Sequence, residues 1–331
     1  MKKRFQVVGI GNALVDMLCH VDENFLEDYR VAKGVMQLID LDRASELSGP
    51  LRTATAVCGG SAANTIAGLA QLGHKTAYVG KVKKDRLGCL FSEDIRSLKV
   101  TFETELAAAE NKFETGRCIV LVTPDGERSM NTYLGASEYL APSDIDADIL
   151  GNSEWLYLEG YRFDGPDSQK AFVDAVHECK KAGGRVALTL SDPFCVERHR
   201  EAFRSLLSSG LDILFCNRQE LLSLYQTQEL DIALDASASE AGIVACTLSE
   251  NGATIARGNE RFRVEAYNVD VVDVTGAGDL FAAGFLHGVL NCVDLAACAR
   301  FGCAAASEIV AHIGARPESN LDDVFRLRGL H

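Results

Sequence analysis

The second half of the sequence alternates between short apolar runs and longer amphipathic segments, and this alternation limits the possible folds more than any other feature. We predict strands over residues 155–158, 185–190 and 212–215, followed in turn by helices over 166–182, 197–209 and 217–225. Further strands are predicted near 243–248, 253–257 and 261–267. Repeated strand-helix units build a mostly parallel sheet with helices on both faces, so we expect a doubly wound α/β fold.

The first half of the chain contains short strands that do not fit this alternation. A buried strand is predicted over Phe5–Ile10, and the irregular pattern of residues 17–56 indicates small strands inserted after it. A turn at residues 123–126 joins two further predicted strands. We expect the inserted segments, about 17–56 and 113–135, to form a small β lid on the α/β core.

Composition excludes several classes of function. The 331 residues carry a formal net charge of −14, which argues against a general affinity for nucleic acid or for anionic membranes. No apolar run reaches about 18 residues, and the N-terminus lacks a secretory pattern, so neither a membrane span nor a signal peptide is expected. The 11 cysteines form no C-x-x-C pair, and a reducing cytoplasm is the simplest setting for them.

A Gly-rich motif near the C-terminus, DVTGAGD, predicts an anion site. It lies between a β-rich run and a segment with helical spacing, and Gly276, Ala277 and Gly278 allow backbone N–H groups to approach a ligand closely. A helix that begins here aims unpaired N–H donors at that ligand, which suits a phosphate. Asp279, in the first turn, could accept a proton from an attacking hydroxyl. The alternative is a Gly-rich turn with a helix-stabilising Asp.

A second polar cluster is predicted at the end of the first strand. Asn12 and Asp16 follow that strand, and the pair Gly59-Gly60 precedes a predicted helix over 61–72 that carries Asn64 in its first turn. Together these side chains could hold a ligand with several hydroxyl groups. Alternatively, they only satisfy turn backbone and allow close helix packing.

Other polar residues also fall at predicted strand ends. Asn217 and Glu220 begin one helix, where they could bind a ligand or act only as its N-cap and first-turn acid. Thr247 to Gly252 follow the next strand. Arg128 could reach a ligand from the predicted hairpin, or lie on a solvated strand face.

Five fragments in fixed order give the chain a family resemblance. They are GNALVD at 11–16, GGSAAN at 59–64, NRQE at 217–220, TLSENG at 247–252 and DVTGAGD at 273–279. With these, the chain resembles the ribokinase-like (PfkB) family of carbohydrate and nucleoside kinases over nearly its whole length. The resemblance implies one kinase domain, residues 1–331, with a doubly wound core, a small β lid, and phosphoryl transfer from ATP to a substrate hydroxyl.

The resemblance also implies roles for particular residues. Asp279 would be the catalytic base, and the backbone N–H groups of Gly276, Ala277 and Gly278 would form the anion hole. ATP would be bound by Asn217, Glu220, Thr247, Ser249, Gly252, Gly276 and Gly278. Asn217 and Glu220 would also hold Mg²⁺, partly through water, and the backbone carbonyls of Asp273 and Thr275 would hold a monovalent cation such as K⁺. Ser249 departs from the family pattern, which often has Gly there.

The first two fragments indicate the substrate. The spacing of Asn12 and Asp16, with Gly59, Gly60 and Asn64, is similar to that of the adenosine kinase-like members, in which these positions grip ribose hydroxyls. We therefore expect phosphorylation of a purine nucleoside, adenosine, at its 5′-hydroxyl. Other predicted substrate contacts are Arg128 and four candidates to flank the base, Leu14, Met36, Tyr161 and Phe163.

Two other functions stay open at this point. A sugar kinase of the fructokinase, ribokinase or 2-keto-3-deoxygluconate kinase type would place polar side chains where a nucleoside kinase has an apolar slot. A non-catalytic nucleoside-binding module would not need Asp279 together with Asn217 and Glu220. The expected partners are the small-molecule substrate and ATP, with neither nucleic acid nor a membrane, and the chain would be a monomer or a homodimer.

Overall fold

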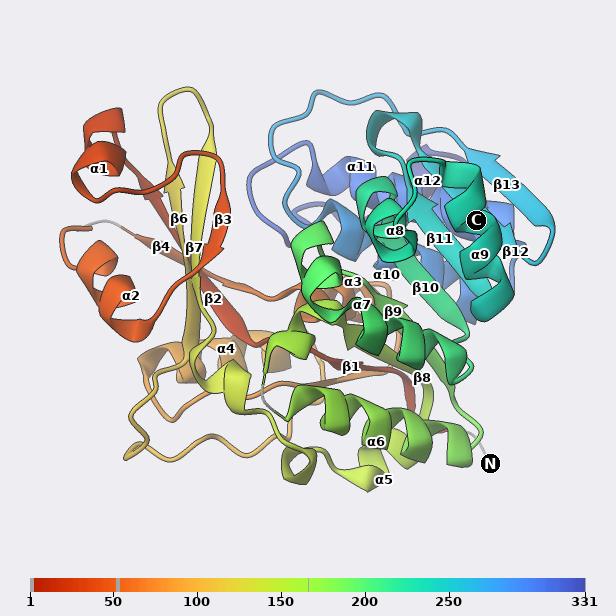
Figure 1. Cartoon of the computed structure of the whole chain (residues 1–331), viewed down its shortest axis with the longest axis horizontal. Helices are drawn as coiled ribbons and strands as arrows, with labels where there is room; N and C mark the ends of the chain where they lie inside the picture. Colours follow the sequence, from red (N-terminus) through yellow and green to blue (C-terminus); the bar gives the residue numbers. More distant parts are fainter. Residues whose placement is uncertain (1–2, 52–53, 166, 331) are drawn as a thin grey trace.

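The computed structural model describes residues 3–51, 54–165 and 167–330 and contains one large sheet (Figure 1). Its strand order is β13-β12-β11-β10-β9-β8-β1-β5. The strands are β1 (Phe5–Ile10), β5 (Thr76–Val79), β8 (Ser153–Glu159), β9 (Arg185–Thr189), β10 (Ile213–Asn217), β11 (Ile243–Thr247), β12 (Ala253–Arg257) and β13 (Glu260–Val264). Neighbouring strands from β5 to β11 are parallel, whereas β12 is antiparallel to both of its neighbours, β11 and β13.

Helices cover both faces of this sheet, which confirms the predicted doubly wound α/β class. One face packs against α3 (Ser61–Gln71), α4 (Arg86–Ser97), α10 (Ala277–Leu290), α11 (Leu295–Ile309) and α12 (Leu321–Leu327). The other packs against α5 (Ala147–Gly151), α6 (Ser168–Lys181), α7 (Pro193–Ser208), α8 (Arg218–Tyr225) and α9 (Leu230–Glu240). Figure 1 shows α6 and α7 in front of the sheet and α10 and α11 behind it. Successive strand residues such as Val7 and Val8 enter opposite cores, as the pleat requires.

A second sheet of five strands stands beside the large one. Its order is β3-β7-β6-β2-β4, and we call it the lid sheet. The strands are β2 (Leu14–His20), β3 (Met36–Leu38), β4 (Thr55–Gly59), β6 (Gly116–Val122) and β7 (Arg128–Tyr133). Figure 1 shows the lid sheet apart from the helices of the core, with two short helices on its outer side.

Four α-helices of the described residues were not predicted from the sequence, among them the short α5. Two of them, α1 (Glu23–Asp28) and α2 (Leu41–Ser48), lie in the segment that was expected to contain only small strands. Asp22 and Asp40 cap them by accepting hydrogen bonds from backbone N–H groups, a local signal that the strand-like run before α2 obscured. Another is α9, whose Ala, Ser and Asp residues give only weak periodicity. Two parts of the predicted elements lie outside the described residues. They are residue 166, the predicted start of a helix, and residues 52–53 of the segment 17–56.

Two histidines meet in the core and make stability depend on pH. His74 Nε2 lies 2.9 Å from His287 Nδ1, and the His287 ring also packs edge-on against Phe301. Burial, together with the His287 charge, lowers the pKa of His74 from its usual 6.5 to about 4. Burial also lowers the pKa of His287. Between pH 6.5 and about 4, the unfolded chain therefore binds protons that the folded chain excludes.

We expect this histidine pair to stabilise the fold fully above pH 6.5 and progressively less as the pH falls towards 4. Buried carboxyls with raised pKa, such as Glu159, act in the opposite direction, so the informative quantity is a difference between variants. The Tm of His74→Gln should fall less between pH 7 and pH 5 than that of the wild type. His20→Gln, at an exposed position, is the control. Equal pH dependence in all three proteins would contradict the prediction.

Candidate active site

The Gly-rich motif forms the start of α10, as predicted. Gly276 has φ +80°, and a Cβ there would lie 2.8 Å from Ala315 Cβ, so the turn needs glycine for both its conformation and its close contact. The Ala277 N–H donates to Val274 O at 3.2 Å. The Ala277 N–H was expected to be free to bind an anion. In this structure it would have to share or release its bond to Val274 O to contact a ligand. Gly278 is exposed.

Asp279 lies in the first turn of α10 and accepts two hydrogen bonds from α3. Ser61 Oγ donates to one carboxylate oxygen at 2.6 Å, and Asn64 Nδ2 donates to the other at 2.9 Å. Burial raises the pKa of Asp279 to about 6, against the effect of these bonds and of the Arg316 charge. The carboxylate is thus mostly ionised at neutral pH and can accept a proton.

Glu159, at the end of β8, was not among the predicted site residues. Its side chain bonds to the segment after β1 and to the start of α3. Its buried carboxylate accepts hydrogen bonds from Asn12 N at 3.2 Å and from Ala62 N at 2.8 Å. Burial raises the pKa of Glu159 to about 7. The Asn12 side chain accepts a bond from the buried Arg162, and Gly60, at φ +99°, lies against Asn12 O. Asn12 is therefore held inside the fold, with its side-chain oxygen already bonded.

Asp16, in β2, projects from the lid sheet towards the same region. Its carboxylate lies against Gly59, where a Cβ would be only 2.4 Å from Oδ2. Burial raises the pKa of Asp16 to about 6, opposed by the charges of Arg316 and Arg128. The Asp279 charge also contributes to this rise, so the two carboxylates share one electrostatic environment. Asn64 faces Asp279 directly, so the structure places these three predicted residues around one site.

The Asp273 carboxylate connects the Gly276 turn with two other segments. It accepts bonds from Thr275 N at 3.0 Å and Thr275 Oγ1 at 2.7 Å, and from Gly314 N at 2.9 Å. Arg128 of β7 forms an ion pair with it at 2.7 Å and also donates to Thr275 Oγ1. Arg128 therefore reaches the turn at Gly276. For Asp273, only the backbone carbonyl was predicted to make a contact, but its side chain holds the turn and the Gly314 loop together.

Asn217 ends β10, and its side chain and that of Glu220 bond to each other. Asn217 Oδ1 accepts from Glu220 N, while the Glu220 carboxylate accepts from Asn217 N at 2.8 Å and from Asn217 Nδ2 at 2.7 Å, which is a capping box for α8. Glu220 is buried, and burial raises its pKa to about 7. Among the residues that the structure describes, no group of three or more His, Cys, Asp or Glu is arranged to hold a metal ion. In this structure the two side chains are paired with each other.

The other residues that were predicted to bind ATP lie at the end of β11 and just after it. Thr247 ends the strand, and its hydroxyl donates to Cys216 O at 3.4 Å. Ser249 has φ +54° and Gly252 φ +78°, so both occupy the left-handed region. This conformation explains physically why glycine suits position 249 and why the serine there is a strained substitute.

Comparison with known proteins agrees with this arrangement. Residues 33–322 match the model of the pfkB family of carbohydrate kinases. The chain belongs to this family. It is therefore a PfkB-type kinase, a phosphotransferase that uses ATP and has an alcohol group of a sugar or nucleoside as acceptor, as the sequence predicted.

Individual members of the pfkB family differ in their named substrates. A 5-dehydro-2-deoxygluconokinase of Shouchella clausii is 27% identical over 322 residues, covering 93% of this chain and 90% of that protein. A probable sugar kinase of Rhizobium etli is 44% identical, with TM-score 0.93, over 99% of this chain and 100% of that one. The adenosine kinase of Sinorhizobium meliloti is also 44% identical, with TM-score 0.91, over 98% and 99%.

The four candidates to flank the base have different surroundings in this pfkB-family chain. Leu14 and Met36 are half-buried in strands of the lid sheet. Tyr161 donates its hydroxyl to Ser191 O at 3.3 Å. The prediction that Phe163 flanks the base is wrong. Its ring is buried in the core on the α6 and α7 face and packs against Phe203, with 4.4 Å between the ring centroids. The short 3₁₀ helix that follows β8 turns its side chain into that core, away from Asp279.

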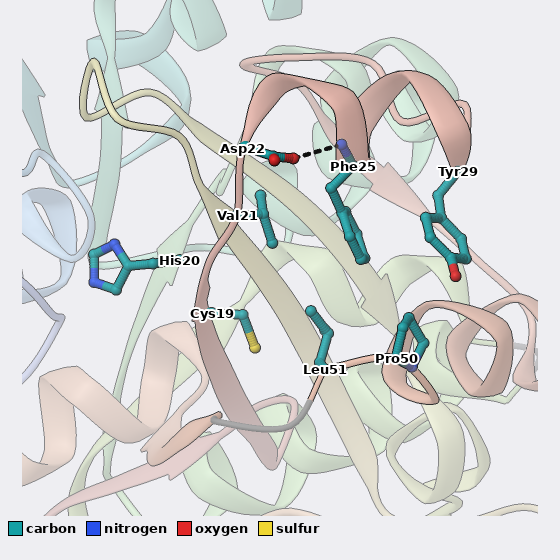
Figure 2. A pocket seen from close by; sticks show the side chains of 8 residues that line it. All are labelled: Cys19, His20, Val21, Asp22, Phe25, Tyr29, Pro50 and Leu51. Atoms are coloured by element: carbon teal, nitrogen blue, oxygen red, sulfur yellow. Dashed lines mark hydrogen bonds between the residues drawn. The ribbon is translucent and has the colours of Figure 1, made fainter.

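A cavity of about 320 Å³ lies elsewhere on this kinase (Figure 2). Its lining comes from the end of β2, from α1 and from the segment after α2, and Figure 2 shows Phe25, Tyr29 and Leu51 around it. These three side chains belong to the apolar cluster on the outer face of the lid sheet. The cavity is therefore separate from the site at Asp279. In the part of the chain that is described, no helix is long and apolar enough to cross a membrane.

Proposed function

We propose that this pfkB-family kinase phosphorylates the 5′-hydroxyl of a purine nucleoside, adenosine, with ATP as donor. One observation carries the choice of a nucleoside over a free sugar: the face of the lid sheet that carries Asp16 is otherwise largely apolar. A nucleobase requires an apolar slot beside the residues that bind ribose, whereas a free sugar presents hydroxyl groups on every side.

Strand register identifies the residues on that face. Asp16 pairs with Cys118, and two residues further on Leu18 pairs with Val120, which pairs with Met130. Alternation along a strand places these side chains on the same face as Asp16. Cys118, Val120 and Val122 form a cluster with Leu18 and Met130 whose members all come from lid strands. We call these five residues the inner lid cluster.

The opposite face of the lid sheet is already covered. Ile119 and Leu121 point to that side and pack with Leu26 of α1 and with Ala44 and Leu47 of α2. The outer face therefore has a structural partner within the chain, while the inner lid cluster is directed to the Asp16 side. Leu14 and Met36, predicted to flank the base, lie on the same face of the lid sheet as Asp16, because the strand register places them an even number of residues from members of that face.

In the proposed reaction, Asp16 accepts hydrogen bonds from ribose hydroxyls and the base lies on the inner lid cluster. Asp279 accepts the proton of the 5′-hydroxyl while that oxygen forms a bond to the γ-phosphorus, and the bond to the bridging oxygen of ADP breaks. N–H groups at the start of α10 stabilise the charge on the transferred group. Mg²⁺ bound to the ATP phosphates would neutralise charge there, with Asn217 and Glu220 acting through water. A monovalent cation at Asp273 and Thr275 stays a prediction.

Acceptor specificity tests this function directly. We would measure Mg-ATP-dependent ADP release, with kcat/KM, for adenosine, inosine, guanosine, cytidine, ribose, fructose, 2-keto-3-deoxygluconate and 5-dehydro-2-deoxygluconate. The last compound is included because of the named relatives. We expect the highest kcat/KM for adenosine. A higher value for any free sugar or sugar acid would contradict the proposal and favour a sugar kinase.

A variant of the inner lid cluster tests the slot itself. Val120→Asn places an amide in an apolar site, where its unpaired donors and acceptors cost free energy on ligand binding. We expect kcat/KM for adenosine to fall about tenfold, mainly through KM. Val173→Asn, at an exposed position of α6, is the matched control and should retain wild-type values. An unchanged KM in Val120→Asn would place the base elsewhere.

A further inference from the structure

Arg316 lies in the loop that follows α11, and its guanidinium is directed to the catalytic residues. Arg316 Nε donates to Asn64 Oδ1 at 2.9 Å, and the same amide donates through Nδ2 to Asp279 Oδ2 at 2.9 Å. These two bonds form a chain from guanidinium to amide to carboxylate. No motif fragment contains Arg316, so the family resemblance gave it no role.

This chain of bonds fixes which end of the Asn64 amide faces Asp279. A guanidinium can only donate hydrogen bonds, so it must face the amide oxygen. The NH₂ group of Asn64 then points to the carboxylate, which can only accept when ionised. Without Arg316 the amide could rotate and present its oxygen to Asp279, an orientation that would favour the protonated carboxyl.

The loop that carries Arg316 is anchored to the catalytic turn. Gly314 N donates to Asp273 Oδ2 at 2.9 Å, and Ala315 packs against Gly276 so closely that a Cβ on that glycine would collide with it. Glu308 holds the other side of the loop by accepting bonds from Glu318 N and Ser319 N. The position of the guanidinium is thus set by the same residues that shape the anion site.

Arg316 is not paired tightly with another carboxylate. Its Nη1 and Nη2 are buried and have no hydrogen-bond partner among the described residues, and the nearest ion pair, to Asp94 of α4, has a separation of 3.7 Å. Its positive charge therefore acts on the carboxylates around it. Ionisable groups from other elements that share this environment with Asp279 are Asp16, Tyr78, Tyr157, Glu159, Tyr161 and Glu220.

We propose that Arg316 is a positioning residue for phosphoryl transfer, which orients the Asn64 amide and keeps Asp279 ionised so that it can accept the substrate proton. This inference rests on the proposed role of Asp279 as the base. The charge of Arg316 opposes the rise in the pKa of Asp279 that burial causes. Removing that charge raises this pKa further, and the fraction of enzyme with an ionised base at neutral pH falls.

Two substitutions separate the orienting bond from the charge. Arg316→Gln keeps a donor but removes the charge, and Arg316→Lys keeps both. We expect the acidic limb of the kcat–pH profile to move up by about one pH unit in Arg316→Gln and to return close to the wild-type position in Arg316→Lys. The kcat of Arg316→Gln should fall about twofold at pH 7 and about tenfold at pH 5, with a smaller change in KM.

The control for a purely structural effect is Asp94→Asn, which removes the charge of the other group near the guanidinium and should leave the acidic limb in place. Tm values for all variants establish that they are folded. An unmoved limb in Arg316→Gln, no rescue in Arg316→Lys, or an equal shift in Asp94→Asn would overturn the proposal.

A second measurement does not depend on the identity of the acceptor. The ¹³C resonance of the Asp279 carboxyl, assigned by its absence in Asp279→Asn, is titrated in wild type, Arg316→Gln and Arg316→Lys. We expect the midpoint to rise in Arg316→Gln only. If no compound in the acceptor panel is phosphorylated, the proposed function fails while this titration still decides the role of Arg316. If adenosine is phosphorylated and the midpoints coincide, only the inference about Arg316 fails.

Discussion

Asp279→Asn is expected to lower kcat by roughly 10²- to 10⁴-fold, the range typical of the loss of a general base. An amide has almost the size of the carboxylate and can keep a hydrogen bond to Ser61 Oγ, so the site should retain its shape. The amide cannot accept the proton of the attacking hydroxyl. The measurement is kcat for the best acceptor under saturating Mg-ATP.

Binding measurements distinguish loss of chemistry from loss of the site. Calorimetric titration of Asp279→Asn with adenosine should give an affinity close to that of the wild type, because Asp16 and the inner lid cluster are unaltered. Ser61→Ala is the companion variant. It removes the 2.6 Å bond to the carboxylate but keeps the base, so a smaller loss is expected. Turnover of Asp279→Asn near the wild-type rate would exclude Asp279 as the base.

Gly276→Ala is expected to have the second largest effect, a loss of about 10²-fold in kcat, together with a Tm lower by a few degrees. The φ of +80° costs an alanine about 1–2 kcal/mol. The added Cβ would also lie 2.9 Å from Ala315 Cα, so one of the two loops must move. Movement of this turn displaces the N–H donors at the start of α10, which accounts for the loss of transition-state stabilisation.

A second glycine separates these two causes. Gly183, after α6, has φ +75°, but a Cβ there meets no atom within 4 Å. Gly183→Ala therefore carries the conformational cost without the collision. We expect its Tm to fall slightly and its kcat to equal that of the wild type. If Gly276→Ala behaved in the same way, the close contact with Ala315 would have no part in catalysis.

Local sequence patterns were sufficient where the information is contained within one element. The turn at Gly276 and the helix start that places Asp279 follow from neighbouring residues, and the structure has both. Helix α9 was missed because its periodicity is weak, and the two helices of the lid segment were missed because they are short and depend on caps and tertiary packing.

Side-chain direction could not be read in the same way. Phe163 follows β8 as a base-flanking residue should, yet its ring enters the core beside Phe203. Asn217 and Glu220 have a spacing that suits both a ligand pair and a helix cap, and in this structure they cap α8 by bonding to each other. In both cases several arrangements suit the local sequence, and packing of distant elements selects one.

The sequence by itself determined the doubly wound class, the family and the position of the Gly276 turn, because each depends on periodicity or on adjacent residues. Only the tertiary structure decided which groups surround Asp279. Asn64 contacts Asp279 across 215 residues, and Arg316 contacts Asn64 across 252 residues. Contacts over such separations form when the parallel sheet brings its strand ends and the following loops to one edge, and the hydrogen-bonding chemistry of each side chain then selects its partner.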